Sequence, residues 1–377
     1  MKNKRRIYAL CALFLALVSI VLLCVLLGTQ REKKENPQKT MPPEKPQTVT
    51  LCAVGDNLIH SPIYKKCKTA DGYNFDCLYE NIAPYIKKHD IAAINQETIF
   101  VQGEENFSGY PLFGTPKEVG ESIVRAGFNV VTHATNHTYD KGKNALFYTM
   151  DFWDNYPCVS VLGLNKSEEA ARKTEILNIN GIKTALLNYT YGLNGHRLPS
   201  GEEYLINIFK RDEKTAAHIK NAKAAADICI VFIHYGTEYT HNPTKEQKAD
   251  VEFLCKNGAD IIIGAHPHVI QPVTAYTSEN QNKAVVFWSL GNFISNQDST
   301  EKILGGMADI TIEKKNGNAY VKSYKMLPTV THADSGGYSA YLLSDYTDAL
   351  AASHRRVPNL TVEKLNDLFC RVMAVTP

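Results

Sequence analysis

Short apolar runs alternate with longer amphipathic segments along most of the chain after residue 49. Runs of about four to eight apolar residues, such as Ile91 to Asn95, Ile228 to His234 and Ile261 to Gly264, predict buried strands. Segments with apolar positions every three or four residues, such as Lys117 to Ala126 and Glu213 to Ala225, predict helices. This alternation is typical of an α/β domain.

The same patterns predict the remaining elements of the domain, which we place at residues 49–334. Further strands are expected at Val49 to Val54, Asn129 to Thr132, Val159 to Leu162 and Val285 to Leu290, and further helices at Leu78 to Lys87, Lys143 to Asn155 and Lys245 to Asn257. Asn-Gly pairs at 180–181 and 316–317 each separate two apolar runs and predict hairpins. Residues 335–377 carry helical patterns at Leu342 to Ser353 and Thr361 to Met373, and we expect a C-terminal helical extension there.

The N-terminus has a different pattern. Residues Ile7 to Leu27 are apolar except for Ser19, which is long enough for a helix to cross a hydrocarbon core of about 30 Å. Basic residues precede this run, so the positive-inside rule predicts that residues 1–6 are cytoplasmic, that residues 7–28 anchor the chain in a cell membrane by a single pass, and that the rest is extracytoplasmic. The alternative is a cleaved signal peptide. The apolar run is longer than a usual signal core, and no small-x-small site follows it, which favours the anchor.

Residues 29–48 are rich in Lys, Glu, Gln and Pro. A segment of this composition cannot bury enough apolar surface to offset the entropy of ordering it, which predicts a disordered stalk between anchor and domain.

Five apolar runs are followed at once by residues that can bind metal ions. Asp56, Glu97, Asn136 and His234 follow four of them, and His266-Pro267-His268 follows the fifth. Open α/β sheets bind their ligands at the carboxyl ends of strands, so these side chains are expected to converge. Carboxylate oxygen and imidazole nitrogen together suit Mn, Fe or Zn.

Composition narrows the possible partners. The chain of 377 residues has a formal net charge of +2, which argues against nucleic acid as a main partner. Of its nine cysteines, Cys11 and Cys24 lie in the apolar N-terminal run, which leaves an odd number beyond it. Cys67 and Cys77 flank a polar loop; a disulfide between them and two free thiols are both compatible with the sequence.

Six motifs, in order, resemble those of the CapA family of poly-γ-glutamate capsule synthesis, whose extracytoplasmic domain is similar to the calcineurin-like metallophosphoesterases. They are Gly55-Asp56, Asn95-Gln96-Glu97, Asn136-His137 with Asp140 beyond, His234 to Tyr239, Gly264 to Pro272, and Ser289 to Phe293. The resemblance covers roughly residues 49 to 330. It implies a four-layer αββα sandwich behind the N-terminal transmembrane helix.

The resemblance also implies roles for particular residues. The metal ligands of a site for one or two ions would be Asp56, Glu97, Asn136, His234, His266 and His268. His137 would be the general acid, oriented by Asp140, and His60, Tyr235, Glu238 and Asn292 would contact substrate or orient the ligands. The chain departs from the phosphoesterase pattern at Leu58, where that pattern has a histidine, and at Glu97, where it has an aspartate.

The function expected from this resemblance is a membrane-anchored, metal-dependent hydrolase-like protein that acts in the synthesis or export of an anionic capsule polymer, poly-γ-glutamate. Its substrate would be that polymer or a phosphorylated compound. Two alternatives stay open at this stage. One is a metal-dependent hydrolase or transferase of γ-glutamyl amide bonds, and the other is a non-enzymatic scaffold subunit of a membrane capsule synthase.

Overall fold

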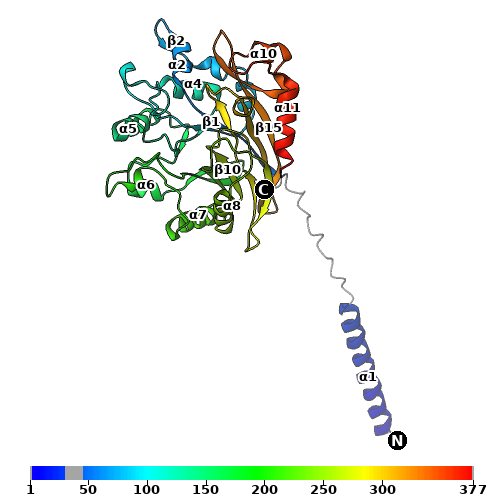
Figure 1. The fold of residues 1–377 in the computed structure, drawn as a ribbon. Helices are drawn as coiled ribbons and strands as arrows, with labels where there is room; N and C mark the ends of the chain where they lie inside the picture. Colours follow the sequence, from blue (N-terminus) through cyan, green and yellow to red (C-terminus); the bar gives the residue numbers. More distant parts are fainter. Residues whose placement is uncertain (1, 30–45, 376–377) are drawn as a thin grey trace. The chain divides into compact units, whose positions relative to one another are not determined.

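The computed structural model describes residues 2–29 and 46–375 as two separate units, a helix and a domain (Figure 1). The helix α1 (Lys2–Thr29) contains the predicted anchor, residues 7–28, and its length and composition would allow it to cross a membrane. Residues 30–45, most of the predicted stalk, lie outside the described residues. The first strand begins at Gln47, two residues before the predicted start.

Residues 46–375 form two large sheets and one small hairpin. The larger sheet has the order β16-β15-β14-β1-β4-β5-β6, with β13 beside β1, and the smaller has the order β11-β12-β10-β9-β8-β7. Strands β1, β4, β5 and β6 run parallel to one another, as do β8, β9, β10 and β12. The strands of the larger sheet are β1 (Gln47–Asn57), β4 (Ile91–Gln96), β5 (Val130–Thr132), β6 (Ser160–Leu162), β13 (Asn292–Ile294), β14 (Leu304–Lys315), β15 (Asn318–Ala333) and β16 (Tyr338–Leu342). Those of the smaller are β7 (Glu175–Ile179), β8 (Ile182–Thr190), β9 (Ile228–His234), β10 (Ile261–Ala265), β11 (Val273–Thr277) and β12 (Lys283–Phe287); β2 (Lys68–Thr69) and β3 (Gly72–Tyr73) form the small hairpin.

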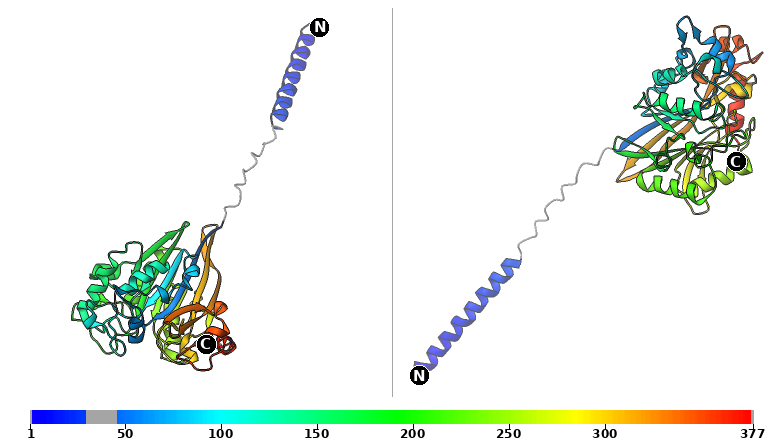
Figure 2. Two further views of the ribbon diagram at one scale, coloured as in Figure 1. Left: turned by 90° about the horizontal axis from the view of Figure 1, so that it is seen from above. Right: turned by 90° about the vertical axis from the view of Figure 1, so that its left-hand side faces the viewer.

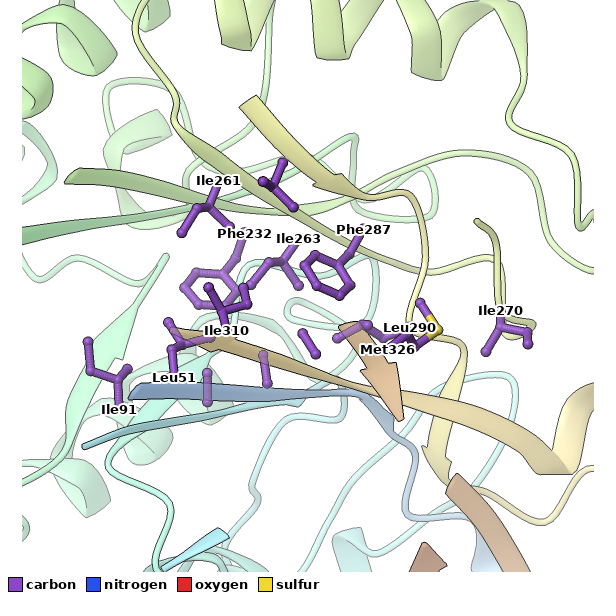
Figure 3. Packing of buried hydrophobic residues seen from close by; sticks show 14 of the residues in the cluster. Leu51, Ile91, Phe232, Ile261, Ile263, Ile270, Phe287, Leu290, Ile310 and Met326 are labelled. Atoms are coloured by element: carbon purple, nitrogen blue, oxygen red, sulfur yellow. The ribbon is translucent and has the colours of Figure 1, made fainter. Parts of the chain in front are cut away.

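The two sheets pack face to face around the main hydrophobic core. Leu51 and Ile310 of the larger sheet face Phe232, Ile263 and Phe287 of the smaller one (Figure 3). Successive side chains of a strand point to opposite faces of the sheet. The residues that alternate with those of the main core therefore point outward and fill a second core on the outer side of each sheet. Both sheets are therefore buried on both faces, which is why their central strands appear in the sequence as uninterrupted apolar runs.

Helices cover the outer face of each sheet. On the larger sheet, α4 (Glu118–Ala126) and α5 (Gly142–Trp153) contribute to one outer core, and on the smaller sheet α7 (Glu213–Ala225) and α8 (Lys245–Lys256) contribute to the other. Figure 2 shows these helices outside the sheets. This arrangement confirms the predicted four-layer αββα sandwich behind one N-terminal apolar helix.

One predicted helix is wrong. Residues 78–87 form only the short turns η1 (Asp76–Leu78) and α3 (Ala83–Ile86). Pro84 has no backbone N–H, and its ring clashes with the carbonyl four residues earlier, so a continuous helix through this position is disfavoured. The remaining short elements are α2 (Ser61–Lys66), η2 (Glu104–Asn106), α6 (Glu168–Arg172), η3 (Glu203–Leu205) and α9 (Thr300–Ile303).

The C-terminal segment is part of the sandwich. The predicted extension, residues 335–377, starts with β16, which pairs with β15 in the larger sheet. It continues through η4 (Leu343–Asp345), α10 (Asp348–Ser353) and α11 (Val362–Met373). Leu365, Leu368 and Val372 of α11 belong to the core between the sheets, so this helix is docked on the domain by apolar burial.

Candidate metal centre

The predicted ligands meet where the carboxyl ends of strands from both sheets come together. Asp56 lies near the end of β1 and Glu97 directly follows β4. His234 is the last residue of β9, and His266 directly follows β10. All four residues are buried, and the largest exposed fraction among them is 4%, at His266. The parallel strands thus bring residues that are distant in sequence to one edge, as predicted.

Asp56 is the most heavily bonded member of the cluster. Its Oδ1 accepts a hydrogen bond from the Asn95 side-chain amide at 2.8 Å, and its carboxylate accepts from the backbone N–H of His266 at 3.2 Å. Its Oδ2 lies 3.0 Å from Nδ1 of His268. Asp56 therefore ties β1 to β4 and to the loop after β10.

The loop after β10 presents its two imidazoles through an unusual backbone conformation. The φ angles of His266 and His268 are +97° and +58°, in a region that side chains with a Cβ seldom occupy. Such positions typically cost about 1–3 kcal/mol each and persist where the surrounding structure enforces them. Here the Asp56 carboxylate holds the His266 N–H, and the Pro267 carbonyl accepts from the backbone N–H of Tyr239 at 2.8 Å.

His268 is oriented by two oxygen atoms. Its Nδ1 lies 3.0 Å from Asp56 Oδ2 and 3.1 Å from Asn292 Oδ1, while the Asn292 side-chain amide donates to the His268 carbonyl. A proton on Nδ1 satisfies these acceptors and leaves Nε2, which lies 4.0 Å from Glu97 Oε1, as a free lone pair. Hydrogen bonds of this kind commonly fix the tautomer and orientation of a metal-binding histidine.

Glu97 is buried without any hydrogen-bond partner within the described residues. Neither carboxylate oxygen has one, and the nearest ring nitrogens are His234 Nε2 at 3.6 Å and His268 Nε2 at 4.0 Å. His266 Nδ1 is likewise buried and unpartnered. Glu97, His266 and His268 each offer one ligand atom, and these atoms lie within 4.8 Å of one another. An orphaned carboxylate beside free imidazole nitrogens fits a bound cation, because burying an unpaired charge is otherwise costly.

Burial shifts the pKa values of Glu97, His234 and His266 in the direction that favours the neutral form of each group. Burial, together with the negative charges of Asp56 and Glu238, raises the pKa of Glu97 well above its usual range. Burial and then His268 lower the pKa of His266 to about 3, and burial lowers the pKa of His234 well below its usual value. His234 and His266 are therefore in the neutral form that binds metal ions. No Lys or Arg within residues 46–375 pairs with Asp56 or Glu97, so no cationic side chain of the described residues balances these carboxylates.

Asn136 and His137 follow β5 and lie against this cluster. Asn136 Oδ1 is 2.8 Å from His234 Nε2, which links it to the predicted ligands. His137 Nδ1 is 2.6 Å from Asp140 Oδ2, and that oxygen also accepts the backbone N–H of Phe113 at 2.8 Å. Asp140 thus holds the ring of His137 by its Oδ2 atom.

The other predicted residues are divided between the site and its surroundings. Asn292 lies in the site. Glu238 is exposed, but its charge reaches Glu97. The ring of Phe113 lies between His60 and His137, with centroids at 5.2 and 4.7 Å. Tyr235 packs in the apolar core beneath α7 and α8, so it belongs to the packing behind β9 and not to the ligand cluster.

Two residues near the site were not predicted from the sequence. The ring of Tyr191 lies 4.7 Å from that of His266, and Asn194 Oδ1 accepts from the Asn136 side-chain amide at 3.2 Å. Both follow β8, whose apolar run ends at Thr190. The other residues of the cluster were predicted because polar residues follow directly after an apolar strand. Polar residues also follow β8, but neither Tyr191 nor Asn194 is a histidine or a carboxylate.

Two curated proteins are similar to this chain. The capsule biosynthesis protein CapA of Bacillus anthracis is 26% identical over 306 residues, which are 79% of this chain and 71% of that protein. The PGA biosynthesis protein CapA of Bacillus subtilis (strain 168) is 28% identical over 254 residues, 66% of this chain and 64% of that protein. The chain thus spans just under two thirds of the second relative.

Among solved structures, a novel phosphatase from Mycoplasma pneumoniae matches 76% of this chain and 95% of its own, with 16% identity and a TM-score of 0.47. The calcineurin-like phosphoesterase YfkN of Bacillus subtilis matches 75% of this chain and 91% of its own, with 16% identity and a TM-score of 0.41. At these TM-scores the likenesses carry no weight for the site.

A family model gives the broader relationship. The model described as bacterial capsule synthesis protein PGA_cap matches residues 50–297, which include every predicted metal ligand and both His137 and Asp140. The match covers more than half of the chain, and the relative from Bacillus anthracis is likewise named a capsule biosynthesis protein. The chain therefore belongs to the PGA_cap family of bacterial capsule synthesis proteins.

Proposed function

We propose that this chain is a membrane-anchored, extracytoplasmic protein whose metal-dependent, hydrolase-like site acts in the synthesis or export of an anionic capsule polymer, poly-γ-glutamate. The observation that carries the proposal is Glu97, a fully buried carboxylate whose two oxygens have no partner within the described residues and which faces three imidazoles. The capsule role is supported by the family and by the names of the two curated relatives.

Glu97, His266 and His268 would hold a divalent transition metal, with Asp56, His234 and Asn136 beside them as further ligands or orienting partners. Oxygen and imidazole donors suit Mn, Fe or Zn. When bound, such an ion lowers the pKa of water and polarises a phosphoryl or carbonyl oxygen. This chemistry serves a phosphoester and a γ-glutamyl amide equally, so the metal cluster alone does not select between these bonds.

His137 would supply the proton for the leaving group. Asp140 holds Nδ1, which leaves Nε2 as the atom that carries the transferred proton. The second contact of the Asp140 carboxylate, with the Phe113 N–H, keeps it from rotating away from the ring. The described geometry thus supports a general acid held beside the ligand cluster.

One observation supports the scaffold alternative. Leu58 is only 2% exposed and occupies the position at which the phosphoesterase pattern has a histidine. An apolar side chain there cannot serve as a ligand, so the site has one donor fewer than that pattern. The alternative predicts a bound metal without hydrolysis.

Metal analysis of purified protein tests the proposal. The full chain, extracted in detergent, should contain a transition metal, and both Glu97→Gln and the double variant His266→Ala/His268→Ala should lose most of it. His89→Ala is the matched control, because His89 precedes β4 at the amino end of the strand, away from the ligand cluster. Full metal content in the double variant would refute the metal centre. Metal without hydrolysis of phosphoester or γ-glutamyl substrates would favour the scaffold.

A further inference from the structure

A pocket lies beside the ligand cluster, and none of the predicted metal ligands lines it. It has a volume of about 780 Å³ and is lined by residues of α6, α7 and the loops 192–198 and 203–210. This volume falls within the usual range for ligand-binding pockets, about 300–1,000 Å³. The pocket is therefore large enough for a ligand of several linked residues.

The pocket and the ligand cluster are connected by the loop after β8. Gly192 and Leu193 line the pocket, while their neighbours contact the cluster: the Tyr191 ring lies at a tilt beside that of His266, and Asn194 accepts a hydrogen bond from Asn136. Gly192 has no atom within 4 Å of the position of an added Cβ, so no other part of the domain packs against the loop there. A chain bound in the pocket would thus lie next to the proposed reaction centre.

The lining carries cations that form no ion pair with a carboxylate, although the charges of Lys210 and Lys214, after the Thr215 N–H, help to lower the pKa of Asp212. Arg197, Lys210 and Lys214 are exposed at the pocket, and within residues 46–375 no side-chain hydrogen bond or ion pair engages their charged groups. The acidic residues of the lining are more engaged. Glu168 pairs with Arg172, and the Asp212 carboxylate caps α7 by accepting the Thr215 N–H at 2.9 Å.

Glu203 is the remaining acidic residue of the lining, and His196 adds an imidazole at the rim. The free positive groups therefore outnumber the free carboxylate. A concave wall with more free cations than free carboxylates raises the local concentration of anions and holds carboxylates through charge-assisted hydrogen bonds.

We propose that this pocket is a separate binding site for a polycarboxylate chain, with Arg197, Lys210 and Lys214 holding carboxylates of polymer residues that lie outside the metal cluster. The identity of the polymer, γ-linked glutamate, rests on the proposed function, whereas recognition of a polycarboxylate rests on the pocket. The site would keep a long substrate beside the reaction centre and would discriminate against short or neutral ligands.

Fluorescence anisotropy with a labelled γ-linked glutamate oligomer tests this, using the full chain in detergent. The Arg197→Gln/Lys214→Gln variant should bind on the order of tenfold more weakly, and its affinity should depend less on salt. Lys220→Gln is the matched control, because Lys220 is exposed on the same helix but does not line the pocket. A γ-linked glutamine oligomer, which is neutral, and inorganic phosphate should compete poorly.

The His266→Ala/His268→Ala variant separates this proposal from the previous one. It should keep its affinity for the oligomer while losing metal, and the pocket variant should keep its metal while losing affinity. Wild-type affinity in the pocket variant, effective competition by the neutral oligomer, or absence of binding by the wild type would each overturn the pocket proposal. Loss of binding in the histidine variant alone would place the polymer at the metal cluster instead.

Discussion

The Nδ1 atom of His137 lies 2.6 Å from Oδ2 of Asp140 in a pair that is almost completely buried. Both residues lie between β5 and α5, so a single short loop supplies the proposed proton donor and its orienting carboxylate. Neither belongs to the group of ligand atoms formed by Glu97, His266 and His268. Proton transfer and metal binding should therefore be separable by mutation.

The variant His137→Ala should lower the kcat of phosphoester hydrolysis by roughly 10²–10⁴, the usual contribution of a general acid. Its metal content should equal that of the wild type, because the ring does not hold the ion. Asp140→Asn should give a smaller loss in kcat with little change in KM, because it misorients the ring without removing it. Parallel kinetics and metal analysis check both expectations. Loss of metal in His137→Ala would show that this residue is a ligand instead.

Gly264 in β10 lets two strands approach closely beneath the site. A Cβ at this position would lie 2.1 Å from the Trp288 carbonyl oxygen and 2.7 Å from the Tyr235 ring. Gly264→Ala should therefore force β10 away from its neighbours and destabilise the domain by about 1–3 kcal/mol or more. Gly192→Ala is the control, because nothing lies within 4 Å of that position. Thermal unfolding should show a clear drop for the first variant alone; equal midpoints would mean that the backbone shifts without cost.

Much of this arrangement could be predicted because burial leaves a clear trace in sequence. Strands β9 and β10 lie between two apolar layers, so every position is apolar and the first polar residue marks the strand end, where His234 and His266 lie. The features that the sequence did not predict also have physical causes. The predicted strand Val285 to Leu290 ends at Phe287, because Trp288 to Gly291 turn across the glycines of β1 and β10. Tyr191 and Asn194 contact the ligand cluster only because the loop after β8 places them there, and their residue types give no sign of this position in the sequence.

His133 should make the stability of the domain depend on pH. Its Nε2 accepts a hydrogen bond from the Trp153 indole at 2.9 Å, and complete burial lowers its pKa from 6.5 to about 3. As the pH falls, His133 is therefore protonated in the unfolded chain at a higher pH than in the folded domain. The stabilisation is complete above about pH 6.5 and decreases as the pH falls toward 3, by about 1.4 kcal/mol per pH unit.

The variant His133→Gln keeps an acceptor for Trp153 but cannot titrate. Urea unfolding at pH 7 and pH 5 should show a smaller loss of stability for this variant than for the wild type. His196→Gln, at an exposed position, should keep the wild-type pH dependence. Identical slopes for wild type and His133→Gln would mean that the buried ring is already protonated in the folded state.

The proposed orientation in the membrane can be tested through thiols already present. Cys158 and Cys370 are exposed on the domain. If the domain is extracytoplasmic, a membrane-impermeant maleimide should label them in intact cells, and the double serine variant should label less. Labelling that requires permeabilised cells would reverse the orientation.

Cys67 and Cys77 should form a disulfide under mild oxidation. Their sulfur atoms lie 4.0 Å apart, with Cys67 directly before β2 and Cys77 in η1, after the β2–β3 hairpin. A hydrogen bond with the Cys67 thiol lowers the pKa of Cys77, and Cys77 is exposed, so its thiolate is the first nucleophile.

With oxidised glutathione, Cys77 would form a mixed disulfide and release one glutathione, and Cys67 would then displace the second. Two thiols should disappear from titration, and the unfolding temperature should rise because the short closed loop restricts the unfolded chain. Cys77→Ser should abolish both effects and leave Cys67 reduced, whereas Cys158→Ser should preserve them. Unchanged thiol counts in the wild type after oxidation would show that the hairpin holds the two sulfurs apart.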